Sequence, residues 1–263
     1  MEDIWKKQQD TSKINYRKSN YLELDKDKIL NLLEKQANFG MYQANYFIVG
    51  VPTNKQINNQ SADAKFQFSI KHRLLRKQMP RYTQLMLIYT QKSFWDIFAN
   101  SSPFADNNYN PGLLLTTPVI RNNKLMGIVS CSVEHESNGR DGDASRSWNF
   151  ITLSSTYFYN PCFSFQVKGW YGFVGKDNPD LIKYRGYGQI ISNYRSFNGR
   201  VGVSLSVNPC SKGVNTQFEV GFKPSKKANE YLFLQWYQGY GESLLDYRQY
   251  TSMVRVGIYL DRL

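Results

Sequence analysis

The chain lacks any stretch near the ~18 consecutive apolar residues of a membrane-spanning helix, although 41% of its 263 residues are hydrophobic. This excludes a helical membrane protein. It leaves a barrel possible, because barrel strands need only ~9–11 residues with every second side chain apolar. Cysteine is scarce: Cys131, Cys162 and Cys210 show no metal-ligand spacing, and an odd number cannot all pair internally. We therefore expect three small, mostly apolar residues rather than a metal site.

Acidic residues are in the minority, since 21 Asp and Glu face 33 Lys and Arg and leave a net charge of +12. Excess basic charge favours an anionic partner, either a nucleic acid or lipid headgroups. A nucleic-acid binder concentrates basic residues on one face among stacking aromatics, whereas the basic residues of this chain are scattered. We therefore expect no nucleic-acid partner.

The N-terminal region differs from the rest of the chain. Its first residues, MEDIWKKQQD, lack the apolar core of a secretory signal, so we expect the numbering to begin after a removed signal. Further on, LDKDKILNLLEKQ places Ile29, Leu32 and Leu33 at helical spacing among charges. The sequence thus predicts an N-terminal extension over residues 1–42 that contains a short amphipathic helix.

Beyond this extension, apolar and polar residues alternate with the period of two that is typical of strands. In KFQFSIK, for example, Phe66, Phe68 and Ile70 share one face, and Lys65 and Gln67 lie on the other. Twelve segments follow this rule, near 43–50, 64–74, 82–93, 112–121, 124–134, 148–158, 163–174, 187–194, 200–208, 216–224, 231–241 and 249–260.

Short and long connections roughly alternate between these segments. RNNK and YNPC are short, whereas ANSSPFADNNYNP and HESNGRDGDASRS are long. Turns at one rim and loops at the other are typical of an up-and-down barrel. The sequence therefore predicts an all-β fold, a 12-stranded antiparallel up-and-down barrel over residues 43–263, with both termini at one rim.

Two architectures are compatible with this alternation: a soluble barrel or sandwich with the apolar face inside, and a membrane barrel with that face toward lipid. The polar faces carry Lys, Glu, Gln and Arg in mid-strand, which favours a polar barrel interior. Aromatic residues near predicted strand ends suit the girdles of a membrane barrel. They are Tyr157, Phe158, Tyr159, Phe173, Tyr237 and Tyr240. We therefore expect the transmembrane barrel.

One of the two histidines stands where a predicted strand meets a long loop, in SVEHESNGRDGDASRSWN. His135 continues the apolar face of Val133, and so does Ser137 if the strand runs on. On the next strand, Asn149 shares its face with Ile151. Antiparallel pairing can therefore bring His135, Ser137 and Asn149 together on the lipid side of the loop rim.

A serine beside an imidazole, with an amide to orient the ring, is the arrangement that nucleophilic catalysis requires. The alternative is an ordinary polar loop at a barrel rim, because His and Ser close in sequence are common and a triad is defined by geometry. Polar groups on a lipid-facing wall are costly unless they are used, which favours the catalytic interpretation.

The same stretch, EHESNGRDGDASRSWN, resembles the signature of the outer membrane phospholipase A family, bacterial enzymes that hydrolyse phospholipid acyl esters. The family motif reads His-x-Ser-Asn-Gly-Arg and then Ser-Arg-Ser-Trp-Asn at this spacing. Further matches in the same order are YTQKSFWD, SSPF, DNPDLIKYRGYGQ and GYGESLLDY. The resemblance covers roughly residues 43 to 263.

This resemblance implies a twelve-stranded barrel in the bacterial outer membrane. It also implies a phospholipase of A1/A2 type, acting on glycerophospholipids and lysophospholipids through a triad of Ser137, His135 and Asn149. Such an enzyme takes its substrate from the surrounding membrane lipid.

The resemblance further implies calcium dependence and activity as a homodimer. The family's Ca2+ ligands match the backbone oxygens of Arg140 and Ser145, with Ser101 supplied by the other subunit. Oxygen ligands of this kind suit calcium. The Gly139 amide matches the family's oxyanion-hole donor, and Gln91 matches its dimer-interface glutamine. An amide that faces lipid is satisfied when it pairs across two subunits.

The chain departs from the family pattern at Ala105, where Arg is usual, and at Asn107, where Thr is usual. Both positions concern contacts around the implied calcium site. The main rival function is a non-catalytic, porin-like outer-membrane barrel. Large interior side chains such as Trp170, Trp236 and Lys168 argue for a filled lumen instead, because small barrels have little internal room.

Overall fold

The computed structural model describes residues 28, 35, 37–58, 61–75, 79–225 and 228–260, and this part is almost entirely β-sheet. The helix predicted around Ile29, Leu32 and Leu33 lies outside the described residues. In the described part, no helix is long and apolar enough to span a membrane.

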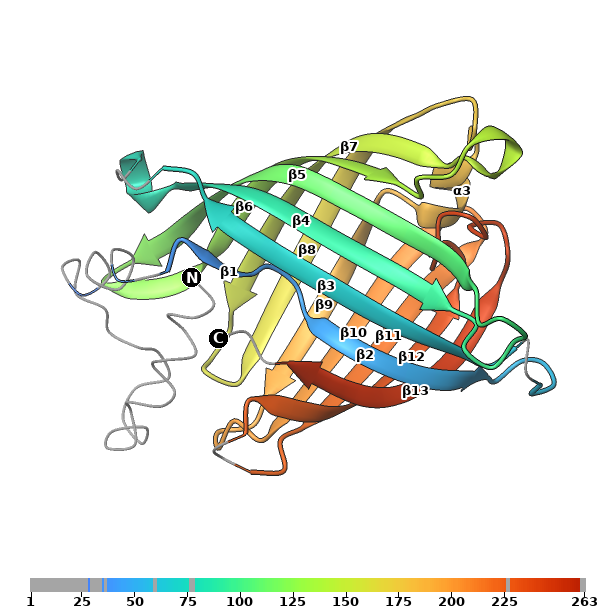
Figure 1. Cartoon of the computed structure of the whole chain (residues 1–263). Helices are drawn as coiled ribbons and strands as arrows, with labels where there is room; N and C mark the ends of the chain where they lie inside the picture. Colours follow the sequence, from blue (N-terminus) through green and yellow to red (C-terminus); the bar gives the residue numbers. More distant parts are fainter. Residues whose placement is uncertain are drawn as a thin grey trace.

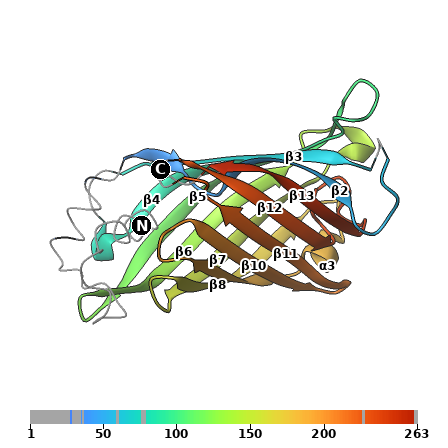
Figure 2. The same cartoon turned by 90° about the horizontal axis from the view of Figure 1, so that it is seen from below.

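Twelve long strands form the barrel (Figures 1 and 2). They are β2 (Asn45–Pro52), β3 (Asp63–Arg73), β4 (Gln84–Trp95), β5 (Phe104–Arg121), β6 (Lys124–Ser137), β7 (Ser147–Phe158), β8 (Phe163–Val174), β9 (Gly188–Arg195), β10 (Val201–Cys210), β11 (Gly213–Phe222), β12 (Glu230–Gly239) and β13 (Thr251–Leu260). Shorter elements are β1 (Phe39–Met41), the 3-10 turns η1 (Pro80–Tyr82) and η2 (Gly142–Ala144), and the helix α3 (Leu181–Arg185).

Each long strand pairs antiparallel with its neighbours in sequence, and β13 closes the sheet by pairing with β2. The extra strand β1 pairs with β3 on the same edge as β2, with Phe39 opposite His72. The two short partners follow each other along that edge. The strand β1 and the C-terminal end of β13 lie at one end of the barrel, which we call the turn rim (Figure 1). The opposite end, the loop rim, carries the β2–β3, β4–β5, β6–β7, β8–β9, β10–β11 and β12–β13 connections. The predicted twelve-stranded antiparallel barrel is confirmed.

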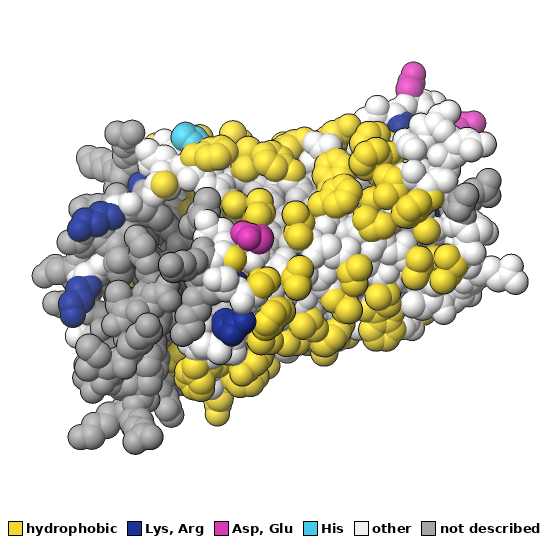
Figure 3. All heavy atoms as spheres, turned by 60° about the horizontal axis from the view of Figure 1, so that its bottom comes forward, with side chains coloured by type: hydrophobic (Ala, Val, Ile, Leu, Met, Phe, Trp, Pro, Cys, Tyr) yellow, Lys and Arg dark blue, Asp and Glu magenta, His cyan; other side chains and the backbone are white. Residues whose placement is uncertain are grey.

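The wall has the polarity of a membrane barrel, with apolar side chains outward and polar ones inward. Leu153 on the outer face is 63% exposed, whereas Lys65 and Arg255 on the inner face are 1% and 2% exposed. Figure 3 shows hydrophobic side chains spread over the visible wall, with few charged side chains among them. The soluble alternative, with an apolar interior, is therefore wrong.

Some details differ from the sequence interpretation. Strand β5 begins at Phe104, inside a stretch expected to be loop, because inward Asp106 and Asn108 find polar partners there. Trp236 lies on the outer face and not in the lumen. Phe158 and Tyr237 are buried at 4% and 8% exposure, so they do not join an outer aromatic girdle.

The loop rim is closed from inside. Leu181 of α3 and Leu244 of the β12–β13 loop pack on Trp148 and Phe150 of β7, and both leucines are fully buried. Glu242 of the same loop bonds Lys65 at 2.9 Å and Arg255 at 2.7 Å. A polar cavity of about 500 Å³ remains in the lumen beneath this plug.

Candidate active site

His135 and Asn149 lie directly opposite each other in the ladder between β6 and β7. Both side chains are on the outer face and exposed, and His135 Nδ1 lies 2.9 Å from Asn149 Oδ1. The backbone is also fixed from the other side, since the Asn110 side chain of β5 donates to the His135 carbonyl at 3.0 Å. The strand pairing itself therefore orients the imidazole.

Ser137 is the last residue of β6 and shares the outer face with His135. It pairs with Ser147 of β7 and Tyr109 of β5, and its side chain is half-buried. Within the described chain, no hydrogen bond joins the Ser137 hydroxyl to the His135 ring. The structure therefore places the serine on the outer face, two residues from the histidine.

The inner face of the same strand pair is clamped by charge. The Trp148 indole donates to the Glu136 carboxylate at 2.8 Å, and Arg185 of α3 pairs with the same carboxylate at 3.2 Å. Glu136 and Trp148 are register partners, and both are buried. They lie between two outward-facing pairs, His135 with Asn149 and Ser137 with Ser147. Strand alternation alone places Glu136 inward. Its partner Arg185 lies 49 residues away in the DNPDLIKYRGYGQ motif, and nothing in the sequence pairs the two residues.

The β6–β7 loop is organised by Asn138, which is 4% exposed. Its side-chain oxygen accepts from the backbone N–H of Arg146 at 2.9 Å and from that of Arg140 at 3.3 Å. Its side-chain nitrogen donates to the Ala144 carbonyl at 2.8 Å. One buried amide thus ties both ends of the loop together directly after Ser137.

Gly139 follows Asn138 with a φ of +66°, a conformation that L side chains rarely adopt. A Cβ at this position would lie 3.0 Å from Cε2 of Tyr109. The glycine therefore lets the main chain turn tightly over the Tyr109 ring. Its amide is thereby held close to the end of β6.

The implied calcium ligands lie in different settings. The Ser145 hydroxyl donates to Asp177 at 3.0 Å, and the Ser145 carbonyl accepts from Arg146 at 2.6 Å. Ser101, with a φ of +64°, lies in the β4–β5 connection and is exposed. In the described chain, no group of three His, Cys, Asp or Glu side chains forms a metal cluster. The available donors are carbonyl, hydroxyl and carboxylate oxygens, which suit calcium.

Asp177 was not anticipated from the sequence as a site residue, although it opens the DNPDL motif. Its carboxylate next to Ser145 adds negative charge to the loop that also carries Asp141 and Asp143. Because Arg140 and Arg146 balance the charges of Asp141 and Asp143, Asp177 contributes one further carboxylate oxygen beside Ser145.

Gln91 lies on the outer face of β4 and is half-buried. Its amide accepts from Tyr89 and donates to Ser93, both at 3.2 Å, and Ser93 donates onward to Asn107 at 2.6 Å. A continuous series of hydrogen bonds thus runs along the outer face from β4 to β5, in an otherwise apolar wall. Within a single subunit the amide already has partners on both its oxygen and its nitrogen.

The fold and this geometry together define a class: a membrane barrel that carries a paired histidine and asparagine on its outer wall. The family model described as Phospholipase A1 matches residues 18–260, and the chain therefore belongs to this family of outer membrane phospholipases A. It is a protein of the bacterial outer membrane.

Individual relatives support the same family assignment. The phospholipase A1 of Escherichia coli K12 is 33% identical over 254 residues, covering 89% of this chain and 86% of that protein. That of Salmonella typhimurium is 34% identical over 213 residues, covering 78% and 71%.

Solved structures of outer membrane phospholipases share the fold of this chain. The outer membrane phospholipase A of E. coli superposes with a TM-score of 0.76 at 29% identity, over 86% of this chain and 99% of that one. The outer membrane phospholipase dimer of Salmonella typhi with bound calcium gives 0.77 at 30% identity, over 89% and 96%.

Proposed function

We propose that this phospholipase hydrolyses acyl esters of glycerophospholipids and lysophospholipids, with both A1 and A2 specificity, through Ser137, His135 and Asn149. The observation that carries the proposal is the 2.9 Å contact between His135 and Asn149 beside Ser137, on the lipid-facing wall. An acyl ester at the membrane surface can reach this wall laterally, without passing through the barrel.

The ring contact sets the proton positions. If Nδ1–H of His135 donates to Asn149 Oδ1, then Nε2 is the free acceptor. Nε2 takes the proton of the Ser137 hydroxyl as its oxygen attacks the ester carbonyl, and His135 returns it to the leaving alcohol. The resulting acyl-serine is hydrolysed when His135 activates a water molecule.

The Gly139 N–H is the proposed oxyanion donor, because it follows Ser137 in the tight turn over Tyr109. The Arg140 carbonyl, Ser145, and Ser101 of a second subunit would hold Ca2+. When bound, this ion supplies Lewis-acid stabilisation of developing negative charge. Dimerisation would then complete the site. The relative from Salmonella typhi is a dimer with bound calcium, which supports activity of this chain as a calcium-dependent homodimer.

A porin-like function is less well supported. Glu242, Lys65 and Arg255 form a buried ion network across the lumen at the loop rim. The leucine contacts between α3 and the β12–β13 loop add an apolar seal. We therefore expect no steady ion conductance from the folded barrel.

Replacing the proposed nucleophile tests the mechanism. Ser137→Ala should lower fatty-acid release from phospholipid micelles by at least ~10³-fold, because a triad without its nucleophile keeps only binding and oxyanion effects. Ser147→Ala, the register partner on β7, is the matched control and should stay within a few-fold of the parent protein. Equal activity of Ser137→Ala and the parent would refute the assignment.

Mixing inactive subunits tests the shared calcium site. Ser101→Ala and Ser137→Ala should each be inactive alone, but their mixed dimer contains one site with Ser137 from one subunit and Ser101 from the other. Random pairing should restore about a quarter of parent activity, because half the dimers are mixed and each has one intact site. A mixture of Ser137→Ala with His135→Ala should restore none. Absence of rescue in the first mixture would mean that Ser101 acts within its own subunit or not at all.

A further inference from the structure

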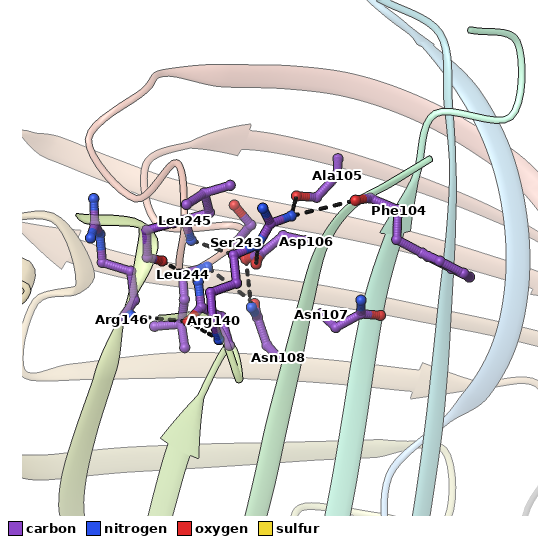
Figure 4. A network of polar contacts seen from close by, with 12 residues as sticks. Phe104, Ala105, Asp106, Asn107, Asn108, Arg140, Arg146, Ser243, Leu244 and Leu245 are labelled. Atoms are coloured by element: carbon purple, nitrogen blue, oxygen red, sulfur yellow. Dashed lines mark hydrogen bonds and ion pairs between the residues drawn. The ribbon is translucent and has the colours of Figure 1, made fainter. Parts of the chain in front are cut away.

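Asp106 lies at the start of β5, and its carboxylate is buried at 1% exposure. Its Oδ2 accepts from the Asn108 side chain at 2.6 Å and from the Leu245 backbone N–H at 2.9 Å. Asn108 in turn accepts from the Leu244 backbone N–H at 3.1 Å. Two inward side chains of one strand thus hold the β12–β13 loop by its main chain (Figure 4).

The other oxygen of Asp106 faces the β6–β7 loop. Oδ1 accepts no hydrogen bond in the described structure, and Nε of Arg140 lies 3.9 Å away. The Arg140 guanidinium also donates to the carbonyl oxygens of Ala105 at 2.5 Å and Phe104 at 3.4 Å. A buried carboxylate oxygen without a donor is costly, so the guanidinium is the group that offsets its charge.

Arg140 is therefore anchored at both ends. Its side chain reaches β5, while its backbone N–H donates to Asn138 within the loop. Between these anchors stand the Gly139 amide and the Arg140 carbonyl, which have roles in the proposed mechanism. The two anchors together restrict how far this peptide can move relative to Ser137.

We infer that Asp106 is a positioning residue that couples the β12–β13 loop to the β6–β7 loop through Arg140, and so fixes the Gly139–Arg140 peptide beside Ser137. The consequence for catalysis rests on the proposed function, whereas the coupling itself does not. The Asp106 carboxylate also lies close enough to affect the β12–β13 loop electrostatically: burial raises the pKa of Asp246 in that loop, and the nearby Asp106 raises it further.

The contacts explain why a carboxylate is needed. The three groups around it, the Asn108 amide, the Leu245 N–H and the Arg140 guanidinium, are all donors. The isosteric change Asp106→Asn would bring an NH2 group against one of them in either orientation. It must therefore lose a contact that the carboxylate keeps.

The experiment compares Asp106→Asn, Arg140→Ala and their double variant in the full-length, refolded barrel. Amide hydrogen exchange of residues 139–146 should quicken in Asp106→Asn. The rate at which a fluorophosphonate labels Ser137 should fall about 10–100-fold, the scale expected for small displacements in an active site. In the Arg140→Ala background, Asp106→Asn should have no further effect on labelling. The calcium concentration that saturates binding in titrations should also shift in Asp106→Asn. It should not shift further when Asp106→Asn is added to Arg140→Ala.

Asp180→Asn is the control. Asp180 bonds Tyr247 and Arg248 of the same β12–β13 loop but makes no contact with Arg140. It should loosen that loop and leave exchange at 139–146 and Ser137 labelling unchanged. Multiplicative labelling effects of Asp106→Asn and Arg140→Ala, or unchanged exchange at 139–146 in Asp106→Asn, would overturn the inference. A parent protein that fails to react with the fluorophosphonate would instead refute the proposed function, while the exchange data would still test the coupling.

Discussion

At the residue scale, the site depends on how one histidine is held. His135 projects from the outer wall, and its Nδ1 contacts an amide instead of a carboxylate. An amide orients the ring but stabilises the imidazolium less. The buried Glu136 and Trp148 between the two outward pairs hold the strand register from within.

Removing the amide should therefore cost activity without unfolding the barrel. Asn149→Ala is expected to lower the turnover rate by about 100-fold or less, because orientation is lost while nucleophile and base remain. Asn149→Asp should recover part of the loss. Steady-state hydrolysis of a short-chain ester in micelles measures both; full activity of Asn149→Ala would show that the ring is oriented by other contacts.

Gly139 permits a second residue-scale test. Gly139→Ala forces an L side chain into a left-handed conformation and brings its Cβ to 3.0 Å from the Tyr109 ring. Gly142→Ala is a matched control, since Gly142 has a φ of +58° but open space around a Cβ. We expect Gly139→Ala to lose about 100-fold in activity, the typical effect of a misplaced oxyanion donor. Similar losses in the two variants would assign the effect to backbone strain alone.

At the element scale, alternation predicted which segments become strands, because every strand must present one face to lipid and one to the lumen. It failed at the start of β5, where Asp106 and Asn108 look like turn formers until their partners on the β12–β13 loop are known. It also predicted the outward positions of His135 and Asn149. The clamp from Arg185 and the Arg140 anchor on β5 depend on three-dimensional loop packing, which no local pattern contains.

The β12–β13 loop gives an element-scale prediction about pH. Burial raises the pKa of Glu242, but the charges of Arg255 and Lys65 outweigh it and lower the pKa to about 2. Because the folded pKa lies below the ordinary value of 4.5, Glu242 stabilises the fold above pH 4.5, and this contribution disappears as pH falls toward 2.

Glu242→Gln should flatten this acid dependence. It should also lower stability at neutral pH by about 3–5 kcal/mol, because Lys65 and Arg255 lose a buried anionic partner. Denaturant unfolding followed by tryptophan fluorescence, at pH values between 2 and 7, measures both. An unchanged acid transition in the variant would remove Glu242 as its cause.

At the scale of the whole molecule, the barrel separates two environments. Its outer wall carries the proposed triad, and its interior carries the ion network and a polar cavity. The hydrogen-bonded series from Tyr89 through Gln91 to Asn107 runs along the outer face of β4 and β5. In the homodimer proposed above, we expect these amides and hydroxyls to lie between the walls of the two subunits.

The sealed loop rim also has a pharmacological consequence. A water-soluble inhibitor that enters the lumen from the turn rim would meet Glu242, Arg255 and the leucine contacts on the inner face. It would not reach the proposed triad, because His135 and Asn149 lie on the outer face. Effective compounds would instead approach the outer wall, along the bilayer or over the exposed β6–β7 loop, so the width of the lumen should not limit their potency.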